Sequence, residues 1–407
     1  MSKGAGIKAL RVETLNKVVS SIPKPKGNFF SGLFATQQEE SDTIRWMFES
    51  GSIGMTPFVA PGSPAPVTTD DMYWREGSAR AAYYKEKRFF DEVFLNNMME
   101  PEVSLKYIKA EKRLAKTLAK LRYRCERRRE WMLTQMMVNG KISYNSEKGL
   151  KFTVDYKIPA RHQIELAVAD KWGTGATRNP VRDMYDLKDL FANEIQTAPK
   201  YTIMNSTTLR LLVFDSTIQD LLKKSTFGEG DLFANPAPVL ARLLGVGDIK
   251  LYDDLYSARS HMVGNVAIGA NTVVVEDVVD MEVGGKARLY DMSQDDVWYD
   301  HTISAIDYAT NTITLATVTT AAFKGGRDIV EMRKKFVPDN KVMMFTDEFE
   351  GEKIAEFMEA PFGLGRHWGL YTDQKEEWDP DGIWVRVQDK GLPVLYNPKT
   401  IVTLKVA

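Results

Sequence analysis

The sequence predicts an α+β chain with a small, all-β part inserted into its second half. Three observations lead to this fold class. Residues 101–138 have the apolar spacing of one long helix. Residues 181–255 alternate short helical and strand patterns, whereas residues 264–330 contain short strand patterns almost exclusively. The mixed pattern resumes at residue 341, so the β-rich stretch is predicted to be an insertion.

Composition describes a globular chain whose charges are unevenly distributed. The 407 residues are 43% hydrophobic and 27% charged, which excludes a disordered or fibrous protein and leaves room for two or three domains. No stretch approaches 18 consecutive apolar residues, so we predict no membrane span. The formal net charge is −1, yet basic residues are concentrated near the N-terminus and in residues 101–138.

Residues 1–50 are predicted to form an N-terminal arm. Pro, Gly and Ser are mixed there with the basic residues Lys3, Lys8, Arg11, Lys17, Lys24 and Lys26. This composition favours an extended segment that packs against another surface. It does not favour a folded domain. One short amphipathic helix is predicted within the arm, at residues 41–49.

Residues 51–100 are predicted to protrude from the body of the chain. Gly, Pro and Thr dominate the first part, and the second part is dense in aromatic and charged residues: Tyr73, Trp74, Arg75, Arg80, Tyr83, Tyr84, Lys85 and Arg88. Because Tyr, Trp and Arg are enriched in the cores of protein interfaces, we expect these side chains to pack on another chain. The alternative is an irregular surface hairpin.

The helix predicted at residues 101–138 has one apolar stripe and a strongly basic remainder. The stripe comprises Tyr107, Leu114, Leu118, Leu121, Cys125, Met132 and Met136. Eleven Lys or Arg outnumber four Glu, so the segment carries a charge of about +7. Such a helix needs a body to lie on and an anionic partner, although a solvated helix is the alternative. The residues expected to face nucleic acid or a neighbouring chain are Arg122, Arg124, Arg127, Arg128 and Arg129 of this helix, together with Lys3, Lys8, Arg11, Lys17, Lys24 and Lys26 of the arm.

Short elements are predicted along the rest of the chain. Strands are expected at residues 151–159, 200–204, 249–252, 341–345, 383–388 and 400–405, and helices at 181–196, 206–212, 216–224 and 236–244. The inserted part is expected to form a small barrel or sandwich from strands at 272–275, 286–290, 297–306, 311–316 and 328–331.

No motif in the sequence indicates catalysis, a metal or a cofactor. The histidines His162, His261, His301 and His367 lack the spacing of metal ligands. Nucleophile elbows, zinc-protease motifs and phosphate-binding loops are absent from the sequence. The single Cys125 lies on the apolar stripe, which favours a packed thiol over a nucleophile. The sequence therefore predicts a protein that is not an enzyme.

The order of these segments resembles the major capsid proteins of tailed bacteriophages, which have the HK97-like fold, and is most similar to the lambda-type branch. Three stretches carry the resemblance: the loop at 55–90, the basic helix at 106–142, and the ending DPDGIWVRVQDKGLPVLYNPKTIVTLKV at 379–406. The resemblance implies an N-terminal arm (1–50), an E-loop (51–100), a peripheral domain (101–180 and 367–407), an axial domain (181–260 and 338–366) and an insertion domain (261–337). The strands at 151–159 and the two final strands would form the long sheet under the helix.

The resemblance also implies a function in assembly. Copies would form the hexamers and pentamers of an icosahedral shell around double-stranded DNA in the virion, after assembly in the host cytoplasm. Few residues precede the loop, so we expect a separate scaffolding protein, together with a portal and a possible decoration protein, and no covalent cross-link between chains. The rival interpretations are an encapsulin-like cellular nanocompartment, and a DNA-binding or carbohydrate-active protein with a β accessory domain.

Overall fold

The chain folds into two compact units, each built from segments that are distant in the sequence. Unit 1 comprises Met1–Met136 and Thr346–Thr400, and unit 2 comprises Met137–Phe345 and Ile401–Ala407. The computed structural model describes residues 7–23, 25, 27–50, 58, 73–145, 151–224, 235–294 and 297–407.

Helix α4 (Leu105–Asn139) confirms the predicted long helix. Its 35 residues span about 52 Å at 1.5 Å per residue. The predicted apolar stripe is buried from Leu114 onwards, and Tyr107 is half-buried. The short helix α3 (Glu92–Met99) precedes α4, and the Asp91 carboxylate caps it by accepting a hydrogen bond from the Phe94 amide.

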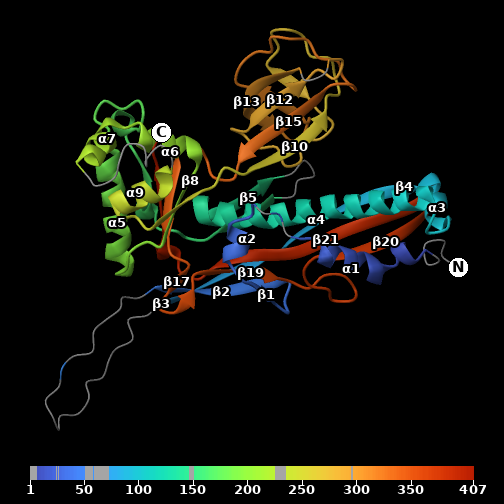
Figure 1. The fold of residues 1–407 in the computed structure, drawn as a ribbon, viewed down its shortest axis with the longest axis horizontal. Coiled ribbons are helices and arrows are strands. Elements are labelled where there is room, and N and C mark those ends of the chain that lie inside the picture. Colours follow the sequence, from blue (N-terminus) through green and yellow to red (C-terminus); the bar gives the residue numbers. More distant parts are fainter. Residues whose placement is uncertain are drawn as a thin grey trace. The chain divides into compact units, whose positions relative to one another are not determined.

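A five-stranded sheet lies along α4 in unit 1 (Figure 1). The long strand β21 pairs with β4 on one side and with β20 and then β19 on the other, and β1 continues the sheet beyond β19. The bounds are β1 (Thr36–Gln38), β4 (Ala82–Asp91), β19 (Ala355–Glu359), β20 (Tyr371–Trp378) and β21 (Asp381–Leu395). The predicted strand at 383–388 is therefore the beginning of a much longer strand.

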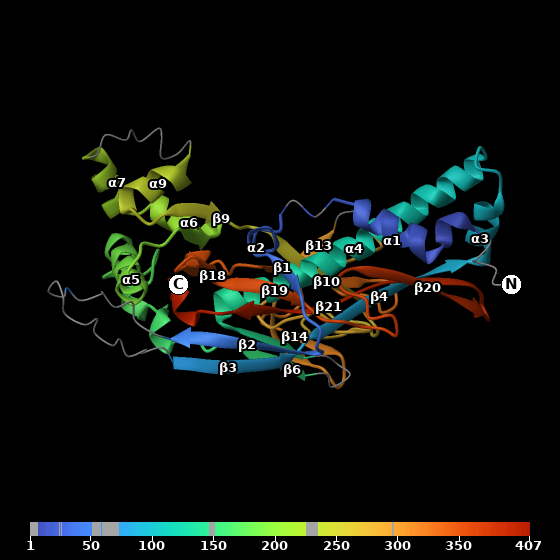
Figure 2. The same ribbon diagram turned by 90° about the horizontal axis from the view of Figure 1, so that it is seen from below.

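The N-terminal segment is folded, which corrects the predicted extended arm. It forms a 3-10 turn η1 (Lys8–Leu10) and helices α1 (Val12–Ser21) and α2 (Phe30–Leu33). Leu10, Leu15 and Val19 are buried in the core that α4, β4 and β21 share, and Figure 2 shows α1 beside α4. The spacing of four residues between Leu15 and Val19 is typical of an amphipathic helix, and it outweighs the Pro and Gly residues that follow.

The helix predicted at residues 41–49 is wrong, because this stretch forms strand β2 (Thr43–Ser50). It pairs with β3 (Tyr73–Arg80) as a two-stranded ribbon. Ile44, Trp46 and Phe48 are buried, so the apolar side chains repeat at every second residue, as they do in a strand. Gly77 lies opposite Trp46, and a Cβ there would sit 2.5 Å from the indole ring, so only glycine leaves room for this packing.

Unit 2 contains a second five-stranded sheet, with the order β7-β22-β16-β8-β9, and its described residues form four α-helices beside it in the sequence. The strands are β7 (Gln163–Glu165), β8 (Tyr201–Met204), β9 (Asp248–Leu251), β16 (Lys341–Phe345) and β22 (Ile401–Lys405). The helices are α5 (Pro180–Ile195), α6 (Ser206–Val213), α7 (Ser216–Lys223) and α9 (Pro236–Leu244). Asn179, Asn205 and Asp215 cap three of these helices by accepting backbone N–H bonds, so the predicted helices and their starting points are confirmed.

Unit 2 also contains a six-stranded antiparallel sheet with its own apolar core. Its order is β10-β15-β12-β13-β14-β11. The strands are β10 (Leu255–His261), β11 (Thr272–Val274), β12 (Lys286–Tyr290), β13 (Trp298–Asp307), β14 (Thr312–Leu315) and β15 (Ile329–Lys335). All five strands predicted in the insertion are confirmed. Strand β10 was not predicted, and it pairs with β15, so this sheet begins at Leu255 and not at residue 261.

Three expected sheet partners differ in the structure. Among the described strands, β6 (Lys151–Asp155) pairs only with β5 (Lys141–Asn145), and β22 joins the sheet of unit 2, so neither belongs to the long sheet beside α4. Strand β19, expected in the axial domain, pairs with β21. Strand pairing depends on contacts that are distant in the sequence, which local patterns do not encode. The remaining elements are β17 (Glu348–Phe349), β18 (Glu352–Lys353), η2 (Ala160–His162), η3 (Val168–Asp170) and η4 (Pro398–Thr400).

Candidate functional site

The basic side chains of α4 divide into an exposed group and a buried group. The exposed cations lie in the first two thirds of the helix: Lys106, Lys109, Lys112, Arg113, Lys116, Lys120 and Arg124. Arg122 and Arg129 are buried, and Arg127 and Arg128 are half-buried. Few acidic side chains lie next to these seven exposed cations to offset their mutual repulsion. This arrangement favours an anionic partner outside the subunit.

Arg129 was expected to face DNA or a neighbouring chain, but it forms buried ion pairs within unit 1. Its Nη2 atom lies 2.7 Å from Glu359 Oε1 and 2.9 Å from Asp389 Oδ2, and the guanidinium lies 4.4 Å from the Phe357 ring centroid. Tyr84 donates its hydroxyl to the same Asp389 oxygen at 2.6 Å. Burial alone would lower the pKa of Arg129, but these acidic neighbours outweigh it and raise the pKa. The network therefore holds α4 on β19 and β21.

Arg122 is likewise used within unit 1. It lies 3.6 Å from Glu126 and donates a hydrogen bond to the carbonyl oxygen of Val19 at the end of α1. The expectation that Arg122 and Arg129 face DNA or another chain is therefore wrong. Helix register turns them inward, because each lies close to the buried face of α4. Arg124 is exposed and forms an ion pair with Glu86 at 2.8 Å.

The predicted interface loop also divides into two parts. Strand β4 is a member of the sheet, so residues 82–91 do not protrude. Tyr83 donates to Gln388 at 2.5 Å and Tyr84 to Asp389, both within the chain, and burial raises the pKa of Tyr84. The side chains that remain exposed are those of Arg75, Arg80, Tyr83, Lys85 and Arg88.

Several expected site residues have only limited structural information. The backbone of Tyr73 and Trp74 lies in β3, while their side chains, and residues 51–57 and 59–72 of the loop, lie outside the described part of the chain. Lys8, Arg11 and Lys17 are exposed on η1 and α1. Lys3, Lys24 and Lys26 lie outside the described residues.

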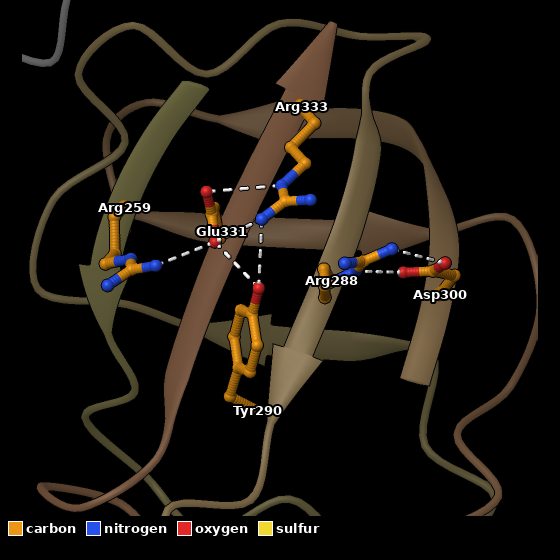
Figure 3. Close-up of polar contacts among 6 residues, drawn as sticks. All are labelled: Arg259, Arg288, Tyr290, Asp300, Glu331 and Arg333. Carbon is orange, nitrogen blue, oxygen red and sulfur yellow. Dashed lines mark hydrogen bonds and ion pairs between the residues drawn. The ribbon is translucent and has the colours of Figure 1, made fainter. Parts of the chain in front are cut away.

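An unexpected polar cluster occupies one face of the six-stranded sheet (Figure 3). Glu331 on β15 accepts a hydrogen bond from Arg259 at 2.8 Å, one from the Tyr290 hydroxyl at 2.9 Å and one from Arg333 at 3.2 Å. Burial opposes ionisation of Glu331, but these three hydrogen bonds outweigh it and lower the pKa of the carboxyl group.

Arg288 and Asp300 continue this cluster across β12 and β13. Arg288 Nε donates to Asp300 Oδ1 at 2.8 Å, and this bond lowers the pKa of Asp300. The Arg288 guanidinium also lies 4.7 Å from the ring centroid of Trp298. Sequence reasoning missed the cluster, although the alternation of charged and apolar residues in these strands indicates a solvated face.

The described residues contain no arrangement suited to catalysis. No group of three metal-ligating side chains occurs among them. His162 is buried, and its Nδ1 lies 3.1 Å from the Ile401 carbonyl oxygen. Cys125 is buried, and burial raises the pKa of its thiol, which disfavours the reactive thiolate. Within the same part of the chain, no helix is long and apolar enough to cross a membrane.

Comparisons with known proteins connect this geometry to one family. The model of the family described as phage major capsid protein E matches residues 11–279 and 312–406. A solved structure assigned as the capsid protein of a prophage from Escherichia coli CFT073 is similar, with 14% identity, a TM-score of 0.54, and coverage of 98% of this chain and 99% of that chain. A phage-related protein from Bordetella bronchiseptica RB50 has 11% identity and a TM-score of 0.49, and 98% of each chain is covered. No curated protein sequence matches the chain.

The family match extends over most of the chain and leaves out residues 280–311, which contain the whole of β12 and β13. The fold is the HK97-like capsid fold, with α4 as its long helix. The protein is a structural component of the virion, not an enzyme, and copies of it assemble into an icosahedral shell. The chain belongs to the phage major capsid protein E family.

Proposed function

We propose that the shell encloses the double-stranded DNA of a tailed phage, and that the exposed cations of α4 and α1 face it. The observation that carries this proposal is the segregation along α4. Seven cations are exposed there, of which Lys106 and Arg124 form ion pairs with Glu100 and Glu86, whereas Arg122 and Arg129 are buried in internal contacts. Surface cations bind phosphates through the release of counterions, a contact that needs no base sequence.

A charge-reversal experiment tests this proposal. The variant Lys109→Glu, Lys112→Glu and Lys116→Glu changes three exposed residues without touching the core. Filled particles of the variant should release DNA at a lower salt concentration than wild-type particles, while empty shells form in unchanged yield. The matched control reverses three exposed cations of unit 2, Arg182, Lys223 and Lys224. If empty shells of the α4 variant also fail to form, these cations serve subunit pairing instead.

We further propose that the β2–β3 ribbon and the loop between its strands form the E-loop contact with a neighbouring subunit in hexamers and pentamers. Support comes from the ribbon itself, which pairs with no other described strand. One of its faces is buried through Ile44, Trp46 and Phe48, and the other exposes Met47 and its cross-strand partner Glu76. The residues proposed for this contact are Tyr73, Trp74, Arg75 and Arg80 of the ribbon, together with the exposed Tyr83, Lys85 and Arg88 of the sheet strand β4 that follows it.

The remaining assignments follow the resemblance to the lambda-type branch. Unit 1 supports a peripheral domain, and the helices and sheet of unit 2 support an axial domain with the six-stranded sheet as its insertion. The proposed partners are a separate scaffolding protein, a portal and a decoration protein, with assembly in the host cytoplasm. Co-expression of the phage's scaffolding protein should raise the yield of regular shells, and an unchanged yield would contradict that partner.

A further inference from the structure

The exposed side of the six-stranded sheet is a preorganised, cationic and aromatic surface. Strand register places Arg259, Glu331, Arg288 and Asp300 in one row across β10, β15, β12 and β13. Tyr290 and Trp298 lie in the row on one side, and Lys286 and Arg333 in the row on the other. These eight residues are called the Arg259 face. The alternating residues, such as Ala287, Leu289 and Met332, point into the core.

The Arg259 face has N–H donors that can bind further carboxylates. Its four cations outnumber its two acidic residues, so its formal net charge is +2. The Glu331 side chain is only 8% exposed and is shared by two arginines, whereas the Arg259 side chain is 59% exposed. A guanidinium has five N–H donors, and the one hydrogen bond of Arg259 on this face leaves donors directed at solvent.

A cavity next to this row can receive an apolar side chain. It has a volume of about 260 Å³, and its wall is formed by Arg259, Tyr290, Asp291, Met292, Gln294, Val297 and Ile329. Asp291 in this wall is paired with Arg327 at 2.7 Å. Arg and aromatic residues around a partly apolar recess are the usual composition of the energetically dominant part of a protein interface. The matching partner therefore presents carboxylates next to a large apolar side chain.

The chain itself carries such a segment in unit 1. The turn between β20 and β21 has the sequence EEWDPD, so Trp378 is flanked by Glu376, Glu377, Asp379 and Asp381. Trp378 is 88% exposed, which is unusual for a residue that buries up to about 250 Å² in interfaces. This segment is called the Trp378 turn. Its acidic charge complements the net positive charge of the Arg259 face, and its indole can contact the apolar wall residues Met292, Val297 and Ile329 of the cavity.

We propose that in the shell the Trp378 turn of one subunit docks on the Arg259 face of a neighbouring copy. The inference rests on the assembly of the chain into a homo-oligomeric shell. The contact joins two different surfaces, so it repeats from subunit to subunit around a symmetry axis. Asp300 and Glu331 within the face disfavour a uniform polyanion such as DNA, whereas a mixed row of charges fits a folded protein segment.

Reciprocal charge reversal tests the contact in full-length chains assembled into empty shells. The turn variant is Glu377→Lys with Asp379→Lys, and the face variant is Arg259→Glu with Lys286→Glu. Each variant should lower the fraction of chains that sediment as shells at least fivefold, because like charges then meet at every copy of the contact. The two sets combined in one chain should restore the fraction to within twofold of wild type.

Controls separate this contact from folding and from shell formation in general. Arg182→Glu with Lys223→Glu makes the same charge change on exposed residues of unit 2 and should assemble normally. Trp378→Ala removes an exposed side chain, so a loss of shells with unchanged thermal unfolding of the unassembled subunit reports on the contact and not on the fold.

Three outcomes would overturn the proposal while leaving the capsid function intact. The first is normal assembly of the turn variant and of Trp378→Ala. The second is a combined variant that assembles no better than the worse of its two parents. The third is a defect of the face variant alone, which would mean that the Arg259 face binds a different partner.

Discussion

At the scale of single residues, the position of each charge on α4 decides its role. Arg122, Glu126, Arg129 and Glu130 recur at intervals that place them near the buried side of the helix, and all four are buried. Their burial is tolerated because each forms an ion pair or hydrogen bonds within unit 1. The exposed cations have the same residue types but point away from the core, so residue type alone does not separate structural charges from those available to a ligand.

Replacement of Arg129 should strongly destabilise unit 1. Arg129→Ala leaves Asp389, whose side chain is 1% exposed, without its cation, and removes the contact with Glu359. Breaking a buried pair costs about 3–5 kcal/mol, so urea unfolding of the unassembled subunit should shift by that amount. Arg124→Ala, which removes an exposed ion pair, should cost no more than about 1 kcal/mol. Equal effects of the two substitutions would contradict the internal role of Arg129.

Glu331 should make the stability of the six-stranded sheet dependent on pH. The pKa of Glu331 is lower in the folded chain than the unfolded value of about 4.3, so the unfolded state takes up protons first as the pH falls. This stabilisation is complete above about pH 5 and is lost as the pH falls through the folded pKa. The difference in unfolding free energy between wild type and Glu331→Gln should therefore be about 1–3 kcal/mol at pH 7 and shrink at pH 3.

Urea unfolding of unassembled subunits at pH 7, 5 and 3 measures this difference. Glu276→Gln is the matched control, because Glu276 is an exposed carboxylate in the same sheet region. Its difference from wild type should stay near zero at each pH. A Glu331→Gln difference that grew toward low pH would refute the assignment.

At the scale of elements, short N-terminal segments are held by polar contacts with their neighbours. Asn16 on α1 donates to the carbonyl oxygen of Thr372 and accepts from the Thr372 amide. It therefore pairs with backbone groups on the outer edge of β20. An exposed edge strand is prone to pair with other chains, and α1 covers it here. At α2, the buried Glu130 carboxylate accepts from the amides of Phe30 and Ser31 at 2.9 and 2.8 Å.

Loss of the Glu130 carboxylate should release α2 from α4. Glu130→Ala leaves two backbone N–H groups without this acceptor, at a cost of about 1–3 kcal/mol each. Hydrogen exchange at residues 30–34 should therefore accelerate at least tenfold, with little change in the β21 amides. Glu111→Ala, on the exposed side of α4, serves as the control and should leave exchange at α2 unchanged. Unchanged protection in Glu130→Ala would show that apolar packing of Phe30 alone holds the segment.

At the scale of the whole molecule, both units are closed by the C-terminal part of the chain. Strand β21 completes the sheet of unit 1, and the final strand β22 then enters the sheet of unit 2. Neither unit can complete its sheet until synthesis reaches the last residues, so assembly-competent subunits require the whole chain. Shell strength then comes from many repeated, individually weak contacts.

We expect these contacts to be non-covalent. Purified shells that are boiled in denaturant should run as a single band at the chain mass of 46.1 kDa. Unheated samples provide the comparison, because intact non-covalent assemblies fail to enter the gel. A ladder of chain multimers after boiling would refute the expectation and indicate a cross-link between subunits.

The sequence by itself determined the elements whose signals are local. The apolar stripe from Leu114 to Met136 predicted α4, capping residues such as Asn205 and Asp215 marked the helix starts, and turn residues separated the strands of the insertion. These signals depend on neighbours within a few residues, so they survive without tertiary information. The same local order carried the resemblance to phage capsid proteins.

Only the tertiary structure decided which strands pair and which charges are buried. The partners of β10, β19 and β22 lie far away in the sequence, and so does β3, the partner of β2, a stretch that was mistaken for a helix. Packing likewise decided which cations of α4 and of the Arg259 face are exposed and which charges are used in internal ion pairs. Burial and long-range pairing are properties of the folded chain, because they depend on groups that come together only when it folds.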